Sequence, residues 1–244
     1  MEMVQIATIR SLNDQTVRLL AASRYDVAVA TSQSALQGFL DFREARGMHR
    51  AGADQNRNDD DDYLGATSAC LHPIPTTVMG LAEWSNVGIF RECFVWFEAP
   101  ALARDTVSED DTHVILTSLL FNLALCHHLR ALSNKMELDD YRIDHNNSSR
   151  GDDLQEAEKI YRSAISAGAV LINERMVIRP GIADSASWML ILAASNNLGC
   201  IAADALDYKT VQECIALGRM ALQSIDLPLF WSNQFDWCNP SAAA

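Results

Sequence analysis

Apolar and small residues recur every three or four positions along most of this chain, which is the spacing of one face of an α-helix. After Tyr25 the stripe is Ala28, Ser32, Ala35, Phe39 and Phe42. Two later stripes are Leu154, Ala157, Tyr161, Ala164, Gly168 and Leu171, and Val211, Cys214, Gly218, Ala221 and Ile225. The pattern predicts a mainly α-helical fold.

Two further helices are predicted in the most apolar parts of the chain, over Thr112 to Leu132 and Trp188 to Ala205. Polar residues that can accept hydrogen bonds from free backbone N–H groups precede the predicted helices. These capping candidates are Ser108 with Asp111, Asp152 with Asp153, and Asp184.

Polar segments separate the helices. Residues 47–62 (GMHRAGADQNRNDDDD) contain almost no apolar side chain, so we expect a disordered acidic linker. Residues 134–153 form a second polar insert. The tail, residues 226–244, holds two phenylalanines and two tryptophans, and we expect it to dock on the helices. We therefore predict one domain over 1–244 with inserts at 47–107 and 134–153.

One segment has a different character. Residues 87–97 (VGIFRECFVWF) are aromatic and β-branched, and alternation places Phe90, Phe94 and Trp96 on one face of a strand. Its partner is expected within residues 71–79, where Pro73 and Pro75 would confine that partner to an edge. The sequence predicts a short β ribbon within 70–98.

Composition restricts the possible partners. The net charge is −13, from 19 basic and 32 acidic residues, and an acidic surface repels a phosphate backbone. We expect no nucleic-acid binding and favour a basic or apolar protein or peptide. The start of the chain has no charged leader before an apolar core, and we find no apolar run close to a membrane span of about 18 residues. The six cysteines include no CxxC pair, so we predict reduced thiols in a cytoplasmic or nuclear protein without membrane contact.

The strongest chemical candidate is Cys126-His127-His128, within LLFNLALCHHLRAL. Neighbouring helical residues point about 100° apart, whereas metal-binding helices space their histidines three or four residues apart. A Cys-His catalytic pair also requires opposed side chains. We therefore predict helix packing here, with His127 on the packed side and His128 toward a groove.

Other candidates are weaker. The stretch from Asp54 to Gly65 imitates a calcium loop, but its sixth and twelfth positions are Asp59 and Gly65 where glycine and glutamate are required. Phosphate-loop, GxSxG and HExxH motifs are missing from the sequence. The paired carboxylates lie at predicted helix starts and in predicted loops, where capping and solubility explain them. We predict a non-enzymatic protein with no catalytic residues, no metal and no cofactor.

The helical stretches come in similar pairs. RYDVAVATSQSAL (24–36) and LDYKTVQECIALGRMAL (206–222) both carry tyrosine and aspartate at the turn, and LQEAEKIYRSAI (154–165) repeats the Ala-Tyr-Ala spacing. FNLALCHH (121–128) and NNLGCIAA (196–203) share Asn-Leu-small. Small residues let helices approach closely, and each pair must bury its apolar face on its neighbour.

These pairs resemble the tetratricopeptide repeat, in three degenerate copies over 12–40, 116–171 and 188–225. Their order, with the aromatic strand inserted after the first pair, is similar to a group of uncharacterised diatom proteins of tetratricopeptide-like sequence. The resemblance implies an α-α superhelix that binds proteins. A carboxylate clamp would use basic residues on the first helix of each pair. The corresponding positions here are Asn13, Val17, Asn122, Ala193 and Asn197, so we expect no such clamp.

The leading functional hypothesis is a groove that binds a peptide or protein segment. Its predicted lining, one turn apart along two first helices, is Ser118, Phe121, Leu125, His128, Asn196, Cys200 and Asp204. Phe121 and Leu125 would be the apolar anchors. Asp204 would favour a basic ligand. The alternative is a structural or self-assembling subunit that uses the aromatic strand and the tail.

Overall fold

The computed structural model of the chain describes residues 2–50, 70–73, 95–98, 109–139, 147–178 and 185–225. Most of them lie in six α-helices: α1 (Glu2–Ala21), α2 (Tyr25–Arg50), α3 (Glu109–Asp139), α4 (Asn147–Ile178), α5 (Ser185–Asp204) and α6 (Tyr208–Ser224). The predicted mainly helical class is confirmed.

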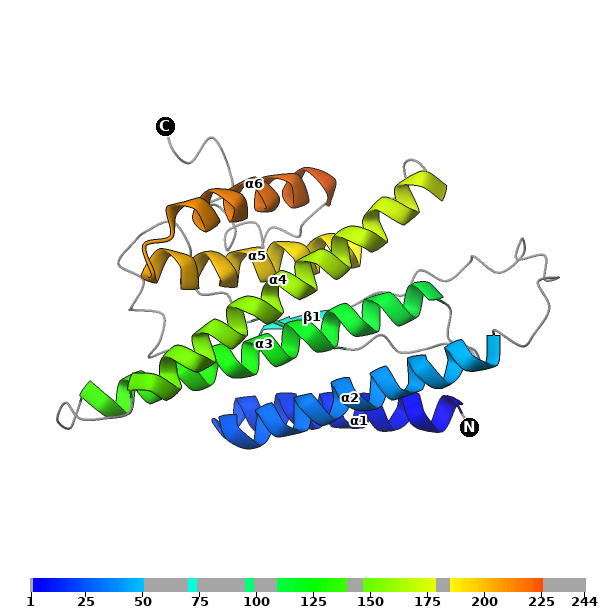
Figure 1. Cartoon of the computed structure of the whole chain (residues 1–244), viewed down its shortest axis with the longest axis horizontal. Coiled ribbons are helices and arrows are strands. Elements are labelled where there is room, and N and C mark those ends of the chain that lie inside the picture. The colour runs from blue at the N-terminus through cyan, green and yellow to red at the C-terminus, as the bar shows by residue number, and fades with distance from the viewer. Residues whose placement is uncertain are drawn as a thin grey trace.

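The helices pack in chain order. α1 packs on α2, α3 on α4, and α5 on α6, while α2 contacts α3 and α4 contacts α5. Figure 1 shows the three pairs one above another, with α4 running diagonally across α3 and reaching α5. Each pair therefore buries an apolar face against the next pair.

The second helix of each pair is amphipathic. The predicted stripe of α2 is buried at all five positions, from Ala28 to Phe42. In α4 the buried stripe includes Ala157, Tyr161 and Ala164, and in α6 it includes Val211 and Cys214. The remaining faces of these helices carry mostly exposed polar residues, so α2, α4 and α6 form the exterior of the stack.

The first helices α3 and α5 are buried on every side. Residues 121–129 of α3 and 190–202 of α5 are buried without interruption. At about 100° per residue, such runs point in all directions around the helix axis. One core cluster runs from α1 to α6 through both helices, and a second joins α1, α2 and the start of α3.

Two of the pairs are closed by the same turn. The amide of Arg24 donates to the carbonyl of Leu19 at 2.9 Å, and the amide of Asp207 donates to that of Ala202 at 2.9 Å. Ser23 and Leu206, the residues just before these donors, have φ of 55° and 57°. This is the helix-ending motif in which one residue adopts the left-handed conformation. Asp207 then caps α6 by accepting from the amide of Thr210 at 3.2 Å.

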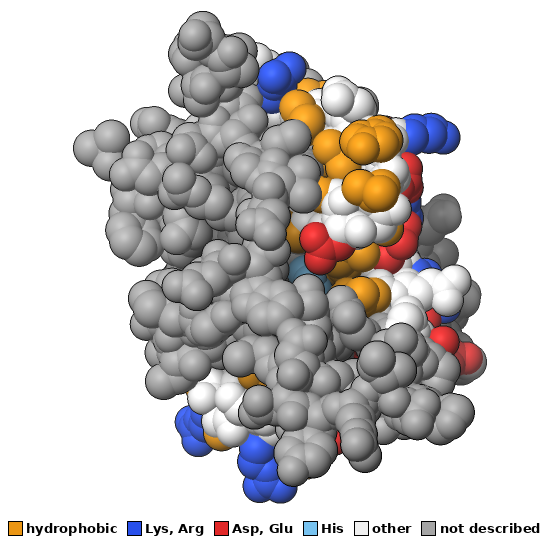
Figure 2. Space-filling view, turned by 90° about the vertical axis from the view of Figure 1, so that its left-hand side faces the viewer, with side chains coloured by type: hydrophobic (Ala, Val, Ile, Leu, Met, Phe, Trp, Pro, Cys, Tyr) orange, Lys and Arg blue, Asp and Glu red, His pale blue; other side chains and the backbone are white. Residues whose placement is uncertain are grey.

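Figure 2 shows the end of the molecule that carries both turns. Hydrophobic side chains gather at the top of this view, at the level of α5 and α6, and Lys and Arg side chains lie both at the top and at the bottom. The exposed apolar residues around the α5–α6 turn include Leu206 and Tyr208, which are 66% and 72% exposed.

Several helix ends differ from the prediction. α2 continues through Gly47 to Arg50, α3 continues to Asp139, and α4 already begins at Asn147. The predicted linker and polar insert are therefore helical at these edges. An exposed polar residue costs a helix little, so loss of the apolar stripe does not end it. Residues 51–62 and 140–146, together with Ser108, Asp184 and the 226–244 tail, lie outside the described residues.

Two short strands are described within the 47–107 insert. β1 (Cys70–Pro73) pairs antiparallel with β2 (Val95–Glu98), with Leu71 opposite Phe97 and His72 opposite Trp96. β2 also contacts α3 and, less extensively, α1. The rest of the predicted strand, including Phe90 and Phe94, lies outside the described residues.

The apolar character of α3 exceeds the expectation from the sequence. Among the described residues, Thr112–Ser133 is long and apolar enough by length and composition to cross a membrane, so the expectation of no such run was wrong. However, 83% of the most apolar window of this stretch is buried inside the protein, as in the core helix of a folded domain.

Candidate functional site

The predicted groove residues lie along α3 and α5, but most of them are interior. Asp204, at the end of α5, is exposed. The other six are buried: Ser118, Phe121, Leu125, His128, Asn196 and Cys200. The prediction assumed that one side of each first helix is open, whereas α3 and α5 are enclosed on all sides. That these seven residues contact a partner remains a prediction.

Asparagines at corresponding positions of all three first helices are buried. Asn122 of α3 donates to the side-chain oxygen of Asn13 of α1 at 2.8 Å. Asn197 of α5 donates to the Tyr161 hydroxyl of α4 at 3.0 Å, and Asn196 donates to Asn197 at 3.1 Å. Buried amides need such partners, so these bonds fix how neighbouring helices meet.

One of these amides keeps a spare donor. Asn13 is 1% exposed, and its Nδ2 atom has no hydrogen-bond acceptor among the residues that the structure describes. An unsatisfied buried N–H costs about 1–3 kcal/mol, so it is a natural place for an additional acceptor. Asn13 lies on α1, one of the two helices that β2 contacts.

Cys126, His127 and His128 are all buried, which fits the helix packing predicted for this stretch, while the predicted orientation of His128 toward a groove remains a prediction. Cys126 is buried, and burial raises the pKa of its thiol far above the ordinary value, which keeps it protonated. His128 is also buried, and burial lowers its pKa to about 4. Its ring meets the Tyr161 ring edge to face, with centroids 6.1 Å apart. A neutral imidazole and a neutral thiol can pack here without an unpaired charge.

His127 takes part in a polar cluster that the sequence did not reveal. Its Nδ1 atom lies 2.9 Å from Oδ1 of Asp153, and because a carboxylate only accepts, Nδ1 carries the proton. Arg130 binds the same carboxylate with two nitrogens, and its Nε donates to Oδ2 at 2.8 Å. Arg130 also reaches Asp26 of α2 at 3.2 Å. The cluster therefore ties together α2, α3 and α4.

Asp153 was predicted as a helix cap, and this is wrong. α4 begins six residues earlier, and Asp153 is buried in its second turn. Although burial raises the pKa of this carboxyl, the hydrogen bonds from Arg130 and His127 outweigh burial and hold it below the ordinary value. The spacing of four from Asp153 to Ala157 already places it on the buried stripe, and this signal was available in the sequence.

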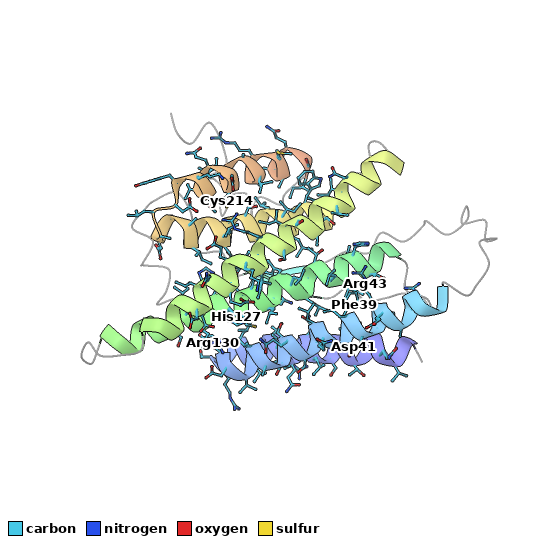
Figure 3. The ribbon with its side chains drawn as sticks, viewed as in Figure 1. Phe39, Asp41, Arg43, His127, Arg130 and Cys214 are labelled. Carbon is cyan, nitrogen blue, oxygen red and sulfur yellow. The ribbon has the colours of Figure 1, made fainter. Side chains whose placement is uncertain are left out.

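Figure 3 labels His127 and Arg130 where α3 runs between α2 and α4. The acidic, basic and thiol groups of this region are paired with one another or neutralised by burial. Within the described residues, no group of three or more histidine, cysteine, aspartate or glutamate side chains is arranged to hold a metal ion. The cluster is suited to joining helices.

A scan against family models, a search of curated proteins and a search of solved structures each found no match. The tetratricopeptide resemblance therefore remains a prediction.

Proposed function

We propose that the chain is a non-enzymatic protein–protein interaction module, a tetratricopeptide-like solenoid whose first helices hold an extended protein segment. The observation that carries this proposal is the burial of α3 and α5 on every side. In the stack of helical pairs, α3 packs on α2, α4 and α5 and also meets α1. Apolar residues also lie on the side of α3 that these helices do not contact. An apolar surface there must be shielded from water by another protein segment.

The repeated features of the pairs support a solenoid. α1–α2 and α5–α6 close with the same left-handed residue and the same backbone hydrogen bonds. Asn13, Asn122 and Asn197 recur in the three first helices. The groups that could do chemistry, Cys126 and His128, are neutral and buried. These features favour recognition over catalysis.

The proposal can be tested by capture with three full-length baits. The first is native, and the second carries Asp204→Lys at the exposed end of α5. A lysine near a helix C-terminus interacts favourably with the helix dipole, so the fold is expected to persist. The third carries Glu213→Lys on the outer face of α6, which changes the net charge equally and serves as the control.

For a partner that binds beside the end of α5, we expect about tenfold weaker binding to the Asp204→Lys chain. Purified partner should bind the native and Glu213→Lys chains equally. Equal binding to all three chains, or capture of nothing by any of them, would contradict the proposal.

A structural role is the second proposal, and exposed apolar residues on the outermost helices favour it. Val4 of α1 and Met220 of α6 are 70% and 53% exposed. Light scattering over a range of concentrations distinguishes the two functions. A concentration-independent oligomer would favour assembly, and a monomer would favour the interaction module.

A further inference from the structure

The turns that close the first and third helical pairs share a backbone conformation but carry different side chains. In each turn the residue that ends the helix is left-handed, with φ of 55° at Ser23 and 57° at Leu206. A bulky side chain rarely adopts this conformation, which favours glycine. The third pair therefore has a leucine at a position where the backbone disfavours it.

The turn itself does not explain the leucine. In this helix-ending motif the supporting apolar contact usually comes from the residue after the left-handed one, which here is Asp207. Leu206 is instead 66% exposed, and Tyr208 is 72% exposed. In the first turn the counterpart of Tyr208 is Tyr25, which packs against the main core. An unfavourable conformation beside exposed apolar side chains indicates a functional surface, and Leu206 and Tyr208 form an exposed apolar knob.

Backbone and capping hydrogen bonds hold the knob in a fixed position. The amides of Leu206 and Asp207 donate to the carbonyls of Ala203 and Ala202, at 3.1 and 2.9 Å. Asp207 also accepts from the amide and the hydroxyl of Thr210, at 3.2 and 2.6 Å. A rigid protrusion loses little conformational entropy when it binds.

An open apolar groove runs along α1. It has a volume of about 490 Å³ and is lined by Val4, Ala7, Thr8, Ser11 and Leu12, none of which is charged. Val4 is 70% exposed, so the groove is accessible from outside. The hydroxyl of Thr8 donates to the backbone carbonyl of Val4 at 2.9 Å and is therefore already satisfied. A groove of this size and character suits large apolar side chains.

Charge favours contact between the two end helices of the stack. The net charge of −13 makes two copies of the chain repel each other. α1 contains two acidic and two basic residues, and α6 contains one acidic and two basic residues. By comparison, α3 contains five acidic residues and two basic ones. The end helices therefore lack the excess of negative charge that would oppose association.

We propose that copies of this chain join head to tail, with Leu206 and Tyr208 of one copy in the α1 groove of the next. α1 lies at one end of the stack and the α5–α6 pair at the other (Figure 1). Because the two surfaces differ, copies form a ring when the rotation between them closes and an open chain when it does not. This inference rests on the structural role, the second proposed function, and specifies its contact.

The first test is analytical ultracentrifugation of the full chain over a range of concentrations, under reducing conditions. We expect the native chain to form assemblies larger than a monomer. Leu206→Gly removes half of the knob, and because glycine suits the left-handed position, the fold is expected to persist. Ser23→Gly makes the same backbone change in the first turn and should associate as the native chain does.

The second test places a charge in the groove with Ala7→Glu and leaves the turn intact. Ala7 is exposed and glutamate is a good helix former, so α1 should remain folded. Alone, the Ala7→Glu and Leu206→Gly chains should each associate at least about tenfold more weakly than the native chain. Their equimolar mixture should form a dimer with one copy of each, because the intact turn of one variant fits the intact groove of the other.

A native chain that stays monomeric would overturn the inference, and so would a mixture of the two variants that does not pair. Circular dichroism checks that each variant folds, and Tyr208→Ser replaces Leu206→Gly if that chain does not. Native-like association of both variants would place the contact elsewhere and leave the structural role standing. None of these results affects the leading proposal, which depends on the separate loss of partner binding in Asp204→Lys.

Discussion

At the scale of single residues, burial determines the charge state of the chemical candidates. His128 contacts the Tyr161 ring and lies in the core cluster region between α3 and α4. Protonating it would place a cation in this interior, which burial disfavours. His127, its neighbour in sequence, has a carboxylate beside it. Two adjacent histidines therefore have different surroundings.

His128 should make the protein less stable in mild acid. Its pKa is about 4 in the folded protein and 6.5 in the unfolded chain, so the folded state favours the neutral form. The stabilisation is complete above pH 6.5 and is lost as pH falls from 6.5 through 4. Linkage gives a loss of about 2 kcal/mol between pH 7 and pH 5.

Urea unfolding at both pH values measures this loss in the native chain and in His128→Gln. The variant should lose about 2 kcal/mol less between pH 7 and pH 5 than the native chain. The same pH dependence in both chains would contradict the assigned role of His128.

The buried polar residues are the part of the structure that the sequence did not predict. The stripe of α4 was visible in Ala157, Tyr161 and Ala164, yet Asp153 was taken as a cap because it is acidic. Its burial depends on Arg130 reaching it from α3, 23 positions earlier in the chain. Such pairing between helices cannot be obtained from the periodicity of either helix alone.

At the scale of elements, periodicity identified the helices and their buried faces but not their ends or their full surroundings. Phase analysis assigns a helix one buried side, and this holds for α2, α4 and α6. It fails for α3 and α5, whose apolar residues occur all around the axis. The predicted lining from Ser118 to Cys200 therefore lies in the interior.

Two glycines test how closely the helices approach one another. A Cβ at Gly168 of α4 would lie 3.1 Å from Cγ1 of Ile191 of α5, whereas a Cβ at Gly38 of α2 would lie 3.7 Å from Cγ1 of Ile9. Glycine inside a helix costs about 0.5–1 kcal/mol relative to alanine. Gly38→Ala should therefore raise the free energy of unfolding by that amount.

At Gly168 the stabilisation gained by replacing glycine with alanine is opposed by steric crowding against Ile191. Gly168→Ala should stabilise less than Gly38→Ala, and Gly168→Val should destabilise by about 1–3 kcal/mol, as overpacked interiors do. Chemical denaturation of the three variants measures these differences. Equal stabilisation by alanine at both positions would mean that α4 and α5 do not meet closely at Gly168.

At the scale of the whole molecule, three helical pairs form a continuous stack with one main core from α1 to α6. The chain has a net charge of −13, while α3 and α5 contribute an apolar interior. An extended strand from the insert meets the first two pairs.

The most direct measurement is hydrogen–deuterium exchange of the full chain, free and saturated with its captured partner segment. We predict slower exchange over 117–129 of α3 and 196–204 of α5, and no change in α6. Slower exchange confined to α6 or the outer face of α2, with α3 and α5 unchanged, would contradict binding by the first helices.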